Sequence, residues 1–365
     1  MRKLVSLNLK NPSDKLKNLS KRLFQAKSLV LSQSTPYEVI DRYQHAHIRY
    51  YAAPKRRFLE PLVFIPPLAV TVAIYDLYPY RSLVQYFQQY GFDVYLIDWG
   101  RLNYAHYALD FTHFLEDMIP HCLTQIRQHS GSQQLSLHGW SMGGLFATLY
   151  TAACKSQDIK NLITLGAPID TFLTGWHGQL LQYTQRLLAH TPRLKNKLYH
   201  GNIPKKIIHT PGKLNALVFK ILDPQGWLNG HQRFLQHLDD LQTVQEHATM
   251  GKYLNDMIDY PGGINQDMVF NIWLQNPLKH GHIQFHDQLI ELKNITANLL
   301  IGAGLRDQLV APAAVSPLCE LTNSADVTFT LLPGGHMGIM SNQKTAKEFW
   351  PQMAIWLQQR STQRE

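Results

Sequence analysis

Residues 134–150, which read QLSLHGWSMGGLFATLY, decide the fold of this chain. Polar and apolar residues alternate up to His138, as in a β-strand, and the residues after Gly143 read as a buried helix. Between them, GWSMG (139–143) has the G-x-S-x-G pattern of a sharp strand-to-helix turn, the nucleophile elbow. The turn needs both glycines, because a Cβ there would collide with the neighbouring strand or helix. The stretch therefore predicts that Ser141 Oγ is lifted out of the sheet edge, at the N-terminus of the following helix.

The rest of the chain repeats this alternation of strand and helix. Short apolar runs that predict strands are 62–65, 94–97, 135–137, 162–165, 299–302 and 327–332, and residues 39–53 predict an opening hairpin or one long strand. The helical segments that separate them are 82–90, 111–129 and 145–155, with a last helix at 347–359. Apolar strands joined by helices are typical of a mostly parallel sheet covered on both faces. The predicted fold class is therefore α/β.

Between roughly 171 and 290 this alternation disappears. The region is helical or irregular and rich in His, Lys, Tyr, Trp and Gly, and an insertion of this size after a central strand predicts a lid over the active site. The chain then divides into a basic tail (1–34), a first core segment with the elbow (35–170), a mainly helical lid (171–290) and a second core segment (291–365). Two interpretations stay open for a basic stretch in the lid, a solvated helical face or a dock for the phosphates of a coenzyme A-type leaving group: Arg193, Lys195, Lys197, Lys205, Lys206, Lys213 and Lys220.

The tail contains an apolar stripe with helical spacing. Its members are Leu16, Leu19, Leu23, Ala26 and Val30, and the Lys and Arg residues of this region lie off that line. The pattern predicts a basic amphipathic helix about 18 residues long, starting near Ser13. Such a helix packs on the body of the protein, or it meets a hydrophobic or anionic surface or a partner helix.

Composition and charge exclude several classes of protein. With 365 residues, 45% hydrophobic and 17% charged, the chain can bury one large core with an inserted subdomain. Residues 1–27 carry +7 of the net +9, which leaves +2 for the other 338 residues, so we expect no nucleic-acid binding. No signal peptide or membrane span is recognisable. Three scattered cysteines in no metal-binding spacing indicate a cytoplasmic protein, and nothing predicts a metal or a cofactor.

A serine hydroxyl needs a histidine to take its proton, and in α/β-hydrolases the chain order is Ser, acid, His. His336 follows the last predicted strand in PGGHMG (333–338), a glycine-rich loop that can reach the elbow. Asp307 follows the predicted strand 299–302, in the loop where this fold carries its carboxylate, and would hold the imidazole tautomer. The rival carboxylates fit structural roles better: Asp326, Asp170 and Asp98. The predicted catalytic residues are Ser141, Asp307 and His336.

The oxyanion hole requires two backbone N–H groups that point at the developing negative charge. Met142, directly after the nucleophile, supplies one. The other is expected from the loop after strand 62–65, where Pro66 and Pro67 have no N–H, so Leu68 or Ala69 is the donor.

Residues 35 to about 360 resemble the polyhydroxyalkanoate synthases, most closely the short type that works with a second subunit. The matching stretches are TPYEV (35–39), DL (76–77) with Pro79 and RSLV (81–84), DVYLIDWG (93–100), NPL (276–278) with Gly281, Asp307 and GGH (334–336). This resemblance implies the α/β-hydrolase fold and places the family's catalytic residues on Ser141, Asp307 and His336. Two departures stand out: the synthases carry cysteine at the position of Ser141, and their Asn-Arg-Pro stretch is replaced here by VTV (70–72).

The serine changes the expected chemistry. A thiol accepts an acyl group from a coenzyme A thioester at little free-energy cost, and the transfer from the enzyme thioester to a hydroxyl then releases free energy. An oxygen ester on Ser141 releases no such free energy in that second transfer. We therefore expect hydrolysis of a carboxylic ester or thioester through an acyl-Ser141 intermediate, on a hydroxyacyl chain or a polyhydroxyalkanoate-like polyester. The alternatives are a synthase-type acyltransferase that uses hydroxyacyl-CoA, and a non-catalytic granule- or partner-binding protein. Expected partners are the acyl substrate, a polyester granule or membrane surface reached through the tail, and a homodimer mate or helper subunit.

Overall fold

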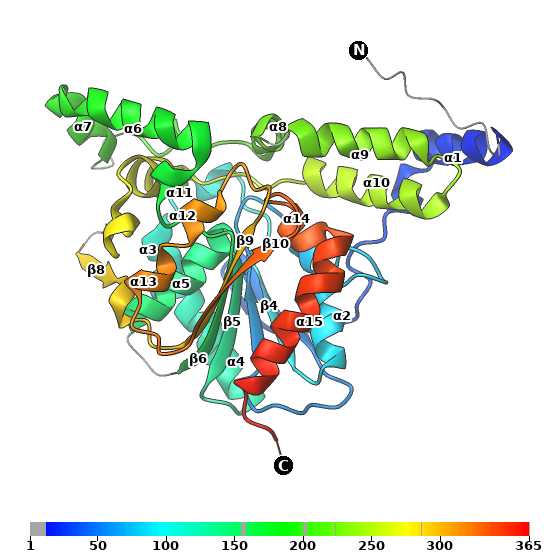
Figure 1. The fold of residues 1–365 in the computed structure, drawn as a ribbon, viewed down its shortest axis with the longest axis horizontal. Coiled ribbons are helices and arrows are strands. Elements are labelled where there is room, and N and C mark those ends of the chain that lie inside the picture. The colour runs from blue at the N-terminus through cyan, green and yellow to red at the C-terminus, as the bar shows by residue number, and fades with distance from the viewer. Residues whose placement is uncertain (1–11, 155–157, 200–202, 223, 286, 365) are drawn as a thin grey trace.

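The computed structural model describes residues 12–154, 158–199, 203–222, 224–285 and 287–364 (Figure 1). The first eleven residues of the predicted tail, with three of its eight basic side chains, lie outside the described residues.

The centre of the molecule is an eight-stranded sheet with the order β1-β2-β4-β3-β5-β6-β9-β10. Its strands are β1 (Glu38–Tyr43), β2 (Ala46–Tyr51), β3 (Leu62–Ile65), β4 (Val94–Asp98), β5 (Leu135–Trp140), β6 (Ile159–Leu165), β9 (Asn298–Gly304) and β10 (Val327–Leu332). The predicted opening segment is the antiparallel hairpin β1–β2, and β2 also runs antiparallel to β4. All other neighbours in the sheet are parallel, so the predicted mostly parallel α/β sheet is confirmed.

Helices cover both faces of the sheet because its central strands are apolar on both sides. Within β3, Val63 and Ile65 belong to one core, and Leu62 and Phe64 belong to the other. The first core is closed by α4 (Ile119–Ser130) and α5 (Met142–Cys154), the second by α2 (Leu83–Gln89) and α15 (Gln343–Gln359). The predicted helix 111–129 is α3 (Phe111–His113), a π-helical segment η4 (Phe114–Met118) and α4 in succession.

The segment between β6 and β9 adds no strand to the main sheet in the part that the structure describes. Its helices are α6 (Gly175–Ala189), α7 (Pro192–Tyr199), α8 (Gly212–Leu222), α9 (Pro224–Gln236), α10 (Leu241–Asn255), α11 (Gly262–Asn265) and the π-helical η6 (Gln266–Leu274). A small hairpin, β7 (His282–Phe285) and β8 (Gln288–Glu291), follows, and three short helices complete the second core segment: α12 (Pro312–Val315), α13 (Leu318–Leu321) and α14 (Gly338–Ser341). In Figure 1 the helices α6 to α10 lie along one side of the molecule, above the sheet.

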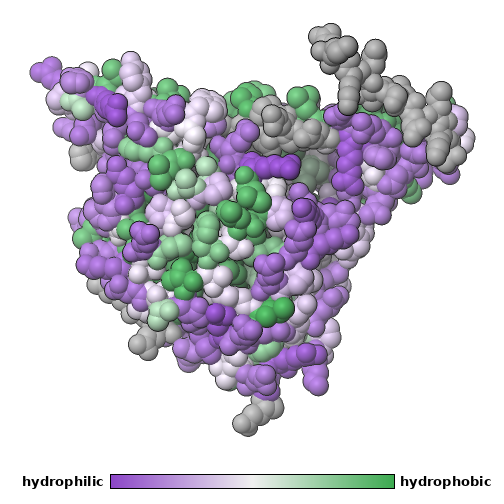
Figure 2. All heavy atoms as spheres, viewed as in Figure 1, coloured by the Kyte–Doolittle hydropathy of each residue, from purple (hydrophilic) through white to green (hydrophobic). Residues whose placement is uncertain are grey.

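The N-terminal helix α1 (Pro12–Phe24) is shorter than the 18 residues that we predicted. The chain leaves the helix at Gln25 and forms a short 3₁₀ turn, so that Leu29 is buried with α9 and α10. The contact with the body is polar: the buried Asn18 donates a hydrogen bond to Leu238 O at 2.9 Å. The leucine stripe points away from it, and Leu16 and Leu23 are 72% and 67% exposed. Figure 2 shows apolar side chains over several helices along this side of the molecule.

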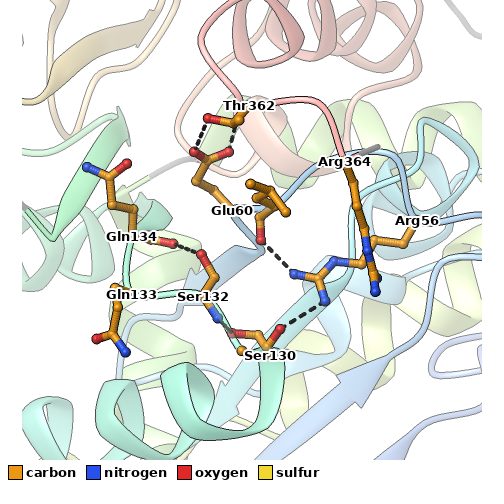
Figure 3. Close-up of a pocket in the computed structure, with 10 residues that line it drawn as sticks. Arg56, Glu60, Ser130, Ser132, Gln133, Gln134, Thr362 and Arg364 are labelled. Carbon is orange, nitrogen blue, oxygen red and sulfur yellow. Dashed lines mark hydrogen bonds between the residues drawn. The ribbon is translucent and has the colours of Figure 1, made fainter.

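The C-terminal segment is clamped at the opposite end of the sheet from the elbow. Thr362 donates to the buried carboxylate of Glu60 through both N–H and Oγ1, each at 2.8 Å, and Lys160 donates to the same carboxylate. Arg56 lies nearby and donates to the carbonyl of Ser130. Arg56, Glu60 and Thr362 line a pocket of about 440 Å³, together with Ser130, Ser132, Gln133 and Arg364. Figure 3 shows Glu60 pointing at Thr362 in this pocket. No described helix is long and apolar enough to cross a bilayer.

We predict that Glu60→Gln weakens this clamp. Burial alone would raise the pKa of Glu60, but the hydrogen bonds from Lys160 and Thr362 outweigh it and lower the pKa. The ionised carboxylate therefore stabilises the fold above the pKa it has when unfolded, and this contribution is lost as the pH falls through the lower native pKa. Urea unfolding at neutral pH should show a loss of about 1–3 kcal/mol in Glu60→Gln. The difference from the parent protein should shrink at acidic pH; a difference independent of pH would contradict this account.

Candidate active site

Ser141 lies at the junction of β5 and α5 with a positive φ of 57°, a backbone conformation that side chains rarely adopt. Its N–H donates to Leu165 O at 2.8 Å, and its carbonyl accepts from Leu145 N at 3.1 Å, which holds the strained turn at both ends. A Cβ on Gly139 would lie 2.2 Å from Gly143 O, and one on Gly143 would lie 2.1 Å from Ile65 O. The sharp turn therefore depends on both glycines, as the elbow motif requires.

The three residues predicted to be catalytic lie together in one chain of hydrogen bonds. His336 Nε2 is 2.8 Å from Ser141 Oγ, and His336 Nδ1 is 2.7 Å from Asp307 Oδ2. Each residue follows a different strand of the parallel part of the sheet, Ser141 after β5, Asp307 after β9 and His336 after β10. The carboxyl ends of parallel strands meet at one edge, so the topology brings together residues that are 195 positions apart in sequence.

The histidine and the carboxylate of this chain are buried. The Asp307 side chain is fully covered and that of His336 is 5% exposed. The second carboxylate oxygen, Oδ1, accepts from the N–H groups of Leu309 at 3.0 Å and Val310 at 2.8 Å. These bonds fix the carboxylate so that Oδ2 faces the imidazole. The Trp140 ring lies 5.4 Å from that of His336 and packs against it.

The rival carboxylates have other partners. Asp170 caps a 3₁₀ turn by accepting from Phe172 N, and also accepts from Asn276 Nδ2. Asp326 forms an ion pair with Arg360, and Asp98 forms one with Arg49. None of these three carboxylates contacts His336.

The predicted oxyanion donors lie at the start of α5 and in the loop after β3. Met142 is the first residue of α5, and the β3 loop is anchored by Trp99 Nε1, which donates to Pro66 O at 2.8 Å. No hydrogen bond from the N–H of Met142, Leu68 or Ala69 to another described residue is found. All three residues are buried, so these N–H groups stay candidates for binding an oxyanion beside Ser141.

Sequence reasoning missed two residues of the segment between β6 and β9 that contact the candidate oxyanion donors. Ile258 N donates to Ala69 O at 3.0 Å, and the half-buried Tyr260 donates its hydroxyl to Met142 Sδ at 3.5 Å. These contacts bridge up to 189 positions of sequence, and no local pattern around 258–260 points to them. Among the described residues, no three His, Cys, Asp or Glu side chains are arranged to hold a metal ion.

Comparisons with known proteins agree with this architecture. A family model described as "alpha/beta hydrolase fold" matches residues 60–343. The chain is 30% identical to the poly(3-hydroxyalkanoate) polymerase subunit PhaC of Allochromatium vinosum, over 82% of this chain and 81% of that protein. It is 25% identical to the corresponding subunit of Haloferax mediterranei, over 90% of this chain but only 64% of that one.

Solved structures show the same fold at low sequence identity. The monoacylglycerol lipase of Paleococcus ferrophilus superimposes with a TM-score of 0.54 at 16% identity, covering 87% of this chain and all of that one. A soluble variant of the monoglyceride lipase of Saccharomyces cerevisiae gives 0.54 at 17% identity, with coverages of 91% and 96%.

Proposed function

Because the chain belongs to the α/β-hydrolase family and is related to the poly(3-hydroxyalkanoate) polymerase subunits over most of its length, we propose that it is a serine-dependent acyl-transfer enzyme that hydrolyses an ester or thioester. The observation that carries the proposal is the hydrogen-bonded chain from Asp307 through His336 to Ser141. Histidine within 2.8 Å of a serine hydroxyl is the arrangement that activates this otherwise weak nucleophile.

The reaction begins when Ser141 Oγ attacks the carbonyl carbon and His336 Nε2 takes the hydroxyl proton. The carbonyl oxygen becomes an oxyanion, which accepts hydrogen bonds from the N–H of Met142 and of Leu68 or Ala69. The intermediate collapses, the bond to the leaving oxygen or sulfur breaks, and His336 returns the proton to the leaving group. Water then attacks the acyl-serine with His336 as base, which frees the acid and restores the hydroxyl. Asp307 stays ionised throughout and stabilises the imidazolium.

The relatives support a substrate class for the proposal. We propose a hydroxyacyl chain or a polyhydroxyalkanoate-like polyester as substrate, and a protein that works in the cytoplasm at a granule or membrane surface, with α1 contributing to that contact. The alternative is an acyltransferase of the polymerase type that uses hydroxyacyl-CoA, which the relationship to the polymerase subunits favours. Ser141 favours hydrolysis, because an oxygen-ester intermediate lacks the free-energy drop that drives a thioester's acyl group onto a hydroxyl. A third possibility, a non-catalytic granule- or partner-binding protein, would not explain why Ser141, His336 and Asp307 are joined by hydrogen bonds.

The basic stretch of the lid gives the coenzyme A alternative mixed support. Lys205 is already paired with Asp110 at 2.8 Å, and Lys206 Nζ lies 5.0 Å from the centre of the Tyr107 ring. The helix α7, in contrast, presents the exposed side chains of Arg193, Lys195 and Lys197. A phosphate dock in the lid would therefore have to use these side chains of α7 or the exposed Lys213 of α8.

Ser141→Cys separates the two reactions. Parent protein and variant are each supplied with a 3-hydroxyacyl-CoA and, separately, with aryl esters, and free acid, free thiol and polymer are measured. We expect free acid from the parent protein, and a shift toward polymer in Ser141→Cys, because a thioester intermediate restores the downhill transfer to a hydroxyl. Polymer as the main product of the parent protein would overturn hydrolysis in favour of acyl transfer. The absence of every product would favour the non-catalytic reading.

A further inference from the structure

Four helices on one side of the molecule turn their apolar stripes toward solvent. A surface helix ordinarily points such a stripe at the core. Here the stripe residues are 38–72% exposed and fall on one side of each helix: Leu16, Leu19 and Leu23 on α1; Trp176, Leu180, Tyr183 and Leu187 on α6; Leu214, Leu217, Val218 and Ile221 on α8; Trp227, Leu228 and Leu235 on α9. We call these residues the apolar platform.

The platform extends along one side of the fold. In Figure 1, α6, α8, α9 and α1 follow one another along the upper side, above the sheet. Figure 2 shows apolar side chains, in green, at several points along the same margin, interspersed with hydrophilic ones in purple. Two of these helices contact the body through residues outside the platform: α1 is tied to it through Asn18, and Phe234 of α9 is buried with residues of α10 and with Leu29. Exposed apolar surface shared by several helices marks a docking site.

The positive charge of the chain gathers in the same place. The described residues 12–27 carry a net +4, and residues 175–236 hold nine Lys or Arg against the single Asp223, a net +8. The remaining segments after residue 27, 28–174 and 237–365, are together acidic, at −6. Exposed cations sit beside the platform, Lys17 on α1, Lys213 on α8 and Lys197 on α7. The positive charge is thus concentrated on the side of the protein that also carries the apolar platform.

The apolar platform and the positive charge together indicate the kind of partner that binds there. A second copy of the chain would bring the same positive charge against itself, and a neutral polyester offers nothing for the cations to bind. An anionic phospholipid layer satisfies both features, because apolar side chains enter the acyl boundary while Lys and Arg reach the phosphates. We propose that the apolar platform docks this protein on an anionic phospholipid surface. The inference rests on the proposed surface role of the protein, and it is independent of the reaction at Ser141.

The test measures binding of the full chain to vesicles by sedimentation and by tryptophan fluorescence. Trp176 and Trp227 lie in the platform and are 65% and 42% exposed, so insertion should shift their emission to the blue. We expect binding to vesicles of equal parts phosphatidylcholine and phosphatidylglycerol, weakening when salt is raised from about 0.1 M to about 1 M. Equal binding to pure phosphatidylcholine, or binding only to polyester particles, would overturn the proposal.

Variants separate the platform from other exposed surface. The double variant Leu217→Glu, Ile221→Glu should lose at least about tenfold in vesicle affinity, and so should Lys213→Glu, Lys220→Glu, at roughly fivefold per lysine. The matched control is Ile355→Glu, on an exposed position of α15 outside the platform, which should bind like the parent protein. Thermal unfolding midpoints verify that each variant is folded. Undiminished binding by both double variants, or self-association that they abolish, would refute the phospholipid partner. Ser141→Ala should bind normally, which keeps this result distinct from failure of the proposed reaction.

Discussion

Ser141→Ala should reduce ester turnover by on the order of 10⁴-fold or more, to the level that binding and the oxyanion donors alone provide. The reason is that the variant removes the atom to which the acyl group is transferred, while the backbone of the elbow stays intact. Alanine tolerates the positive φ of this position no worse than serine does, so the fold should survive. The measurement is kcat/KM for an aryl ester, with circular dichroism and unfolding curves for both proteins.

The matched control is Ser136→Ala, five residues earlier, in strand β5. Ser136 is buried and accepts a hydrogen bond from Asn161, far from His336 along the chain, so its loss should affect stability more than turnover. An equal collapse of activity in both variants would mean that strand β5 had been distorted. Full turnover in Ser141→Ala would show that another residue is the nucleophile.

Asp307→Asn should lower kcat by about 10³- to 10⁴-fold. The backbone N–H groups of Leu309 and Val310 demand an acceptor at Oδ1, so the asparagine must place its carbonyl there and its NH₂ toward His336. An NH₂ donor facing Nδ1 forces the imidazole proton onto Nε2. That nitrogen then faces Ser141 as a donor and cannot accept the hydroxyl proton.

The control for this variant is Asp326→Asn, which weakens the ion pair with Arg360 but lies outside the hydrogen-bonded set. We expect Asp326→Asn to change stability modestly and to leave kcat near that of the parent protein. Near-normal kcat in Asp307→Asn would exclude Asp307 as the residue that orients the histidine.

The fold could be predicted from the sequence because the patterns that indicate its strands, turns and helices are local. The strand, the G-x-S-x-G turn and the helix around Ser141 occupy 17 consecutive residues, and the apolar runs that make β3, β4, β6 and β9 are each bounded by turn residues. The positions of Asp307 and His336 could be predicted too, because in a parallel sheet the loops that follow the strands converge at one edge.

What the sequence could not provide depends on long-range contacts. The leucine stripe of α1 predicts amphipathicity, but the same stripe can face the core or the solvent, and the contacts of Asn18 with Leu238 and of Arg22 with His247 decide which. The bond from Tyr260 to Met142 joins residues 118 positions apart, and the clamp between Glu60 and Thr362 joins residues 302 apart. The role that we propose for the basic residues between 193 and 220 likewise depends on the exposed apolar stripes of α6, α8 and α9, which only the folded structure reveals.

The central claim is that an acyl group is transferred to Ser141, and covalent labelling tests it most directly. Folded protein is treated with a fluorophosphonate, which modifies activated serine hydroxyls, and the modified peptide is located by mass spectrometry. We predict a single adduct on Ser141 that is lost in Ser141→Ala and strongly reduced when His336 is replaced by alanine. A protein that turns over esters while Ser141 stays unlabelled, or that carries the adduct on another serine, would contradict the account.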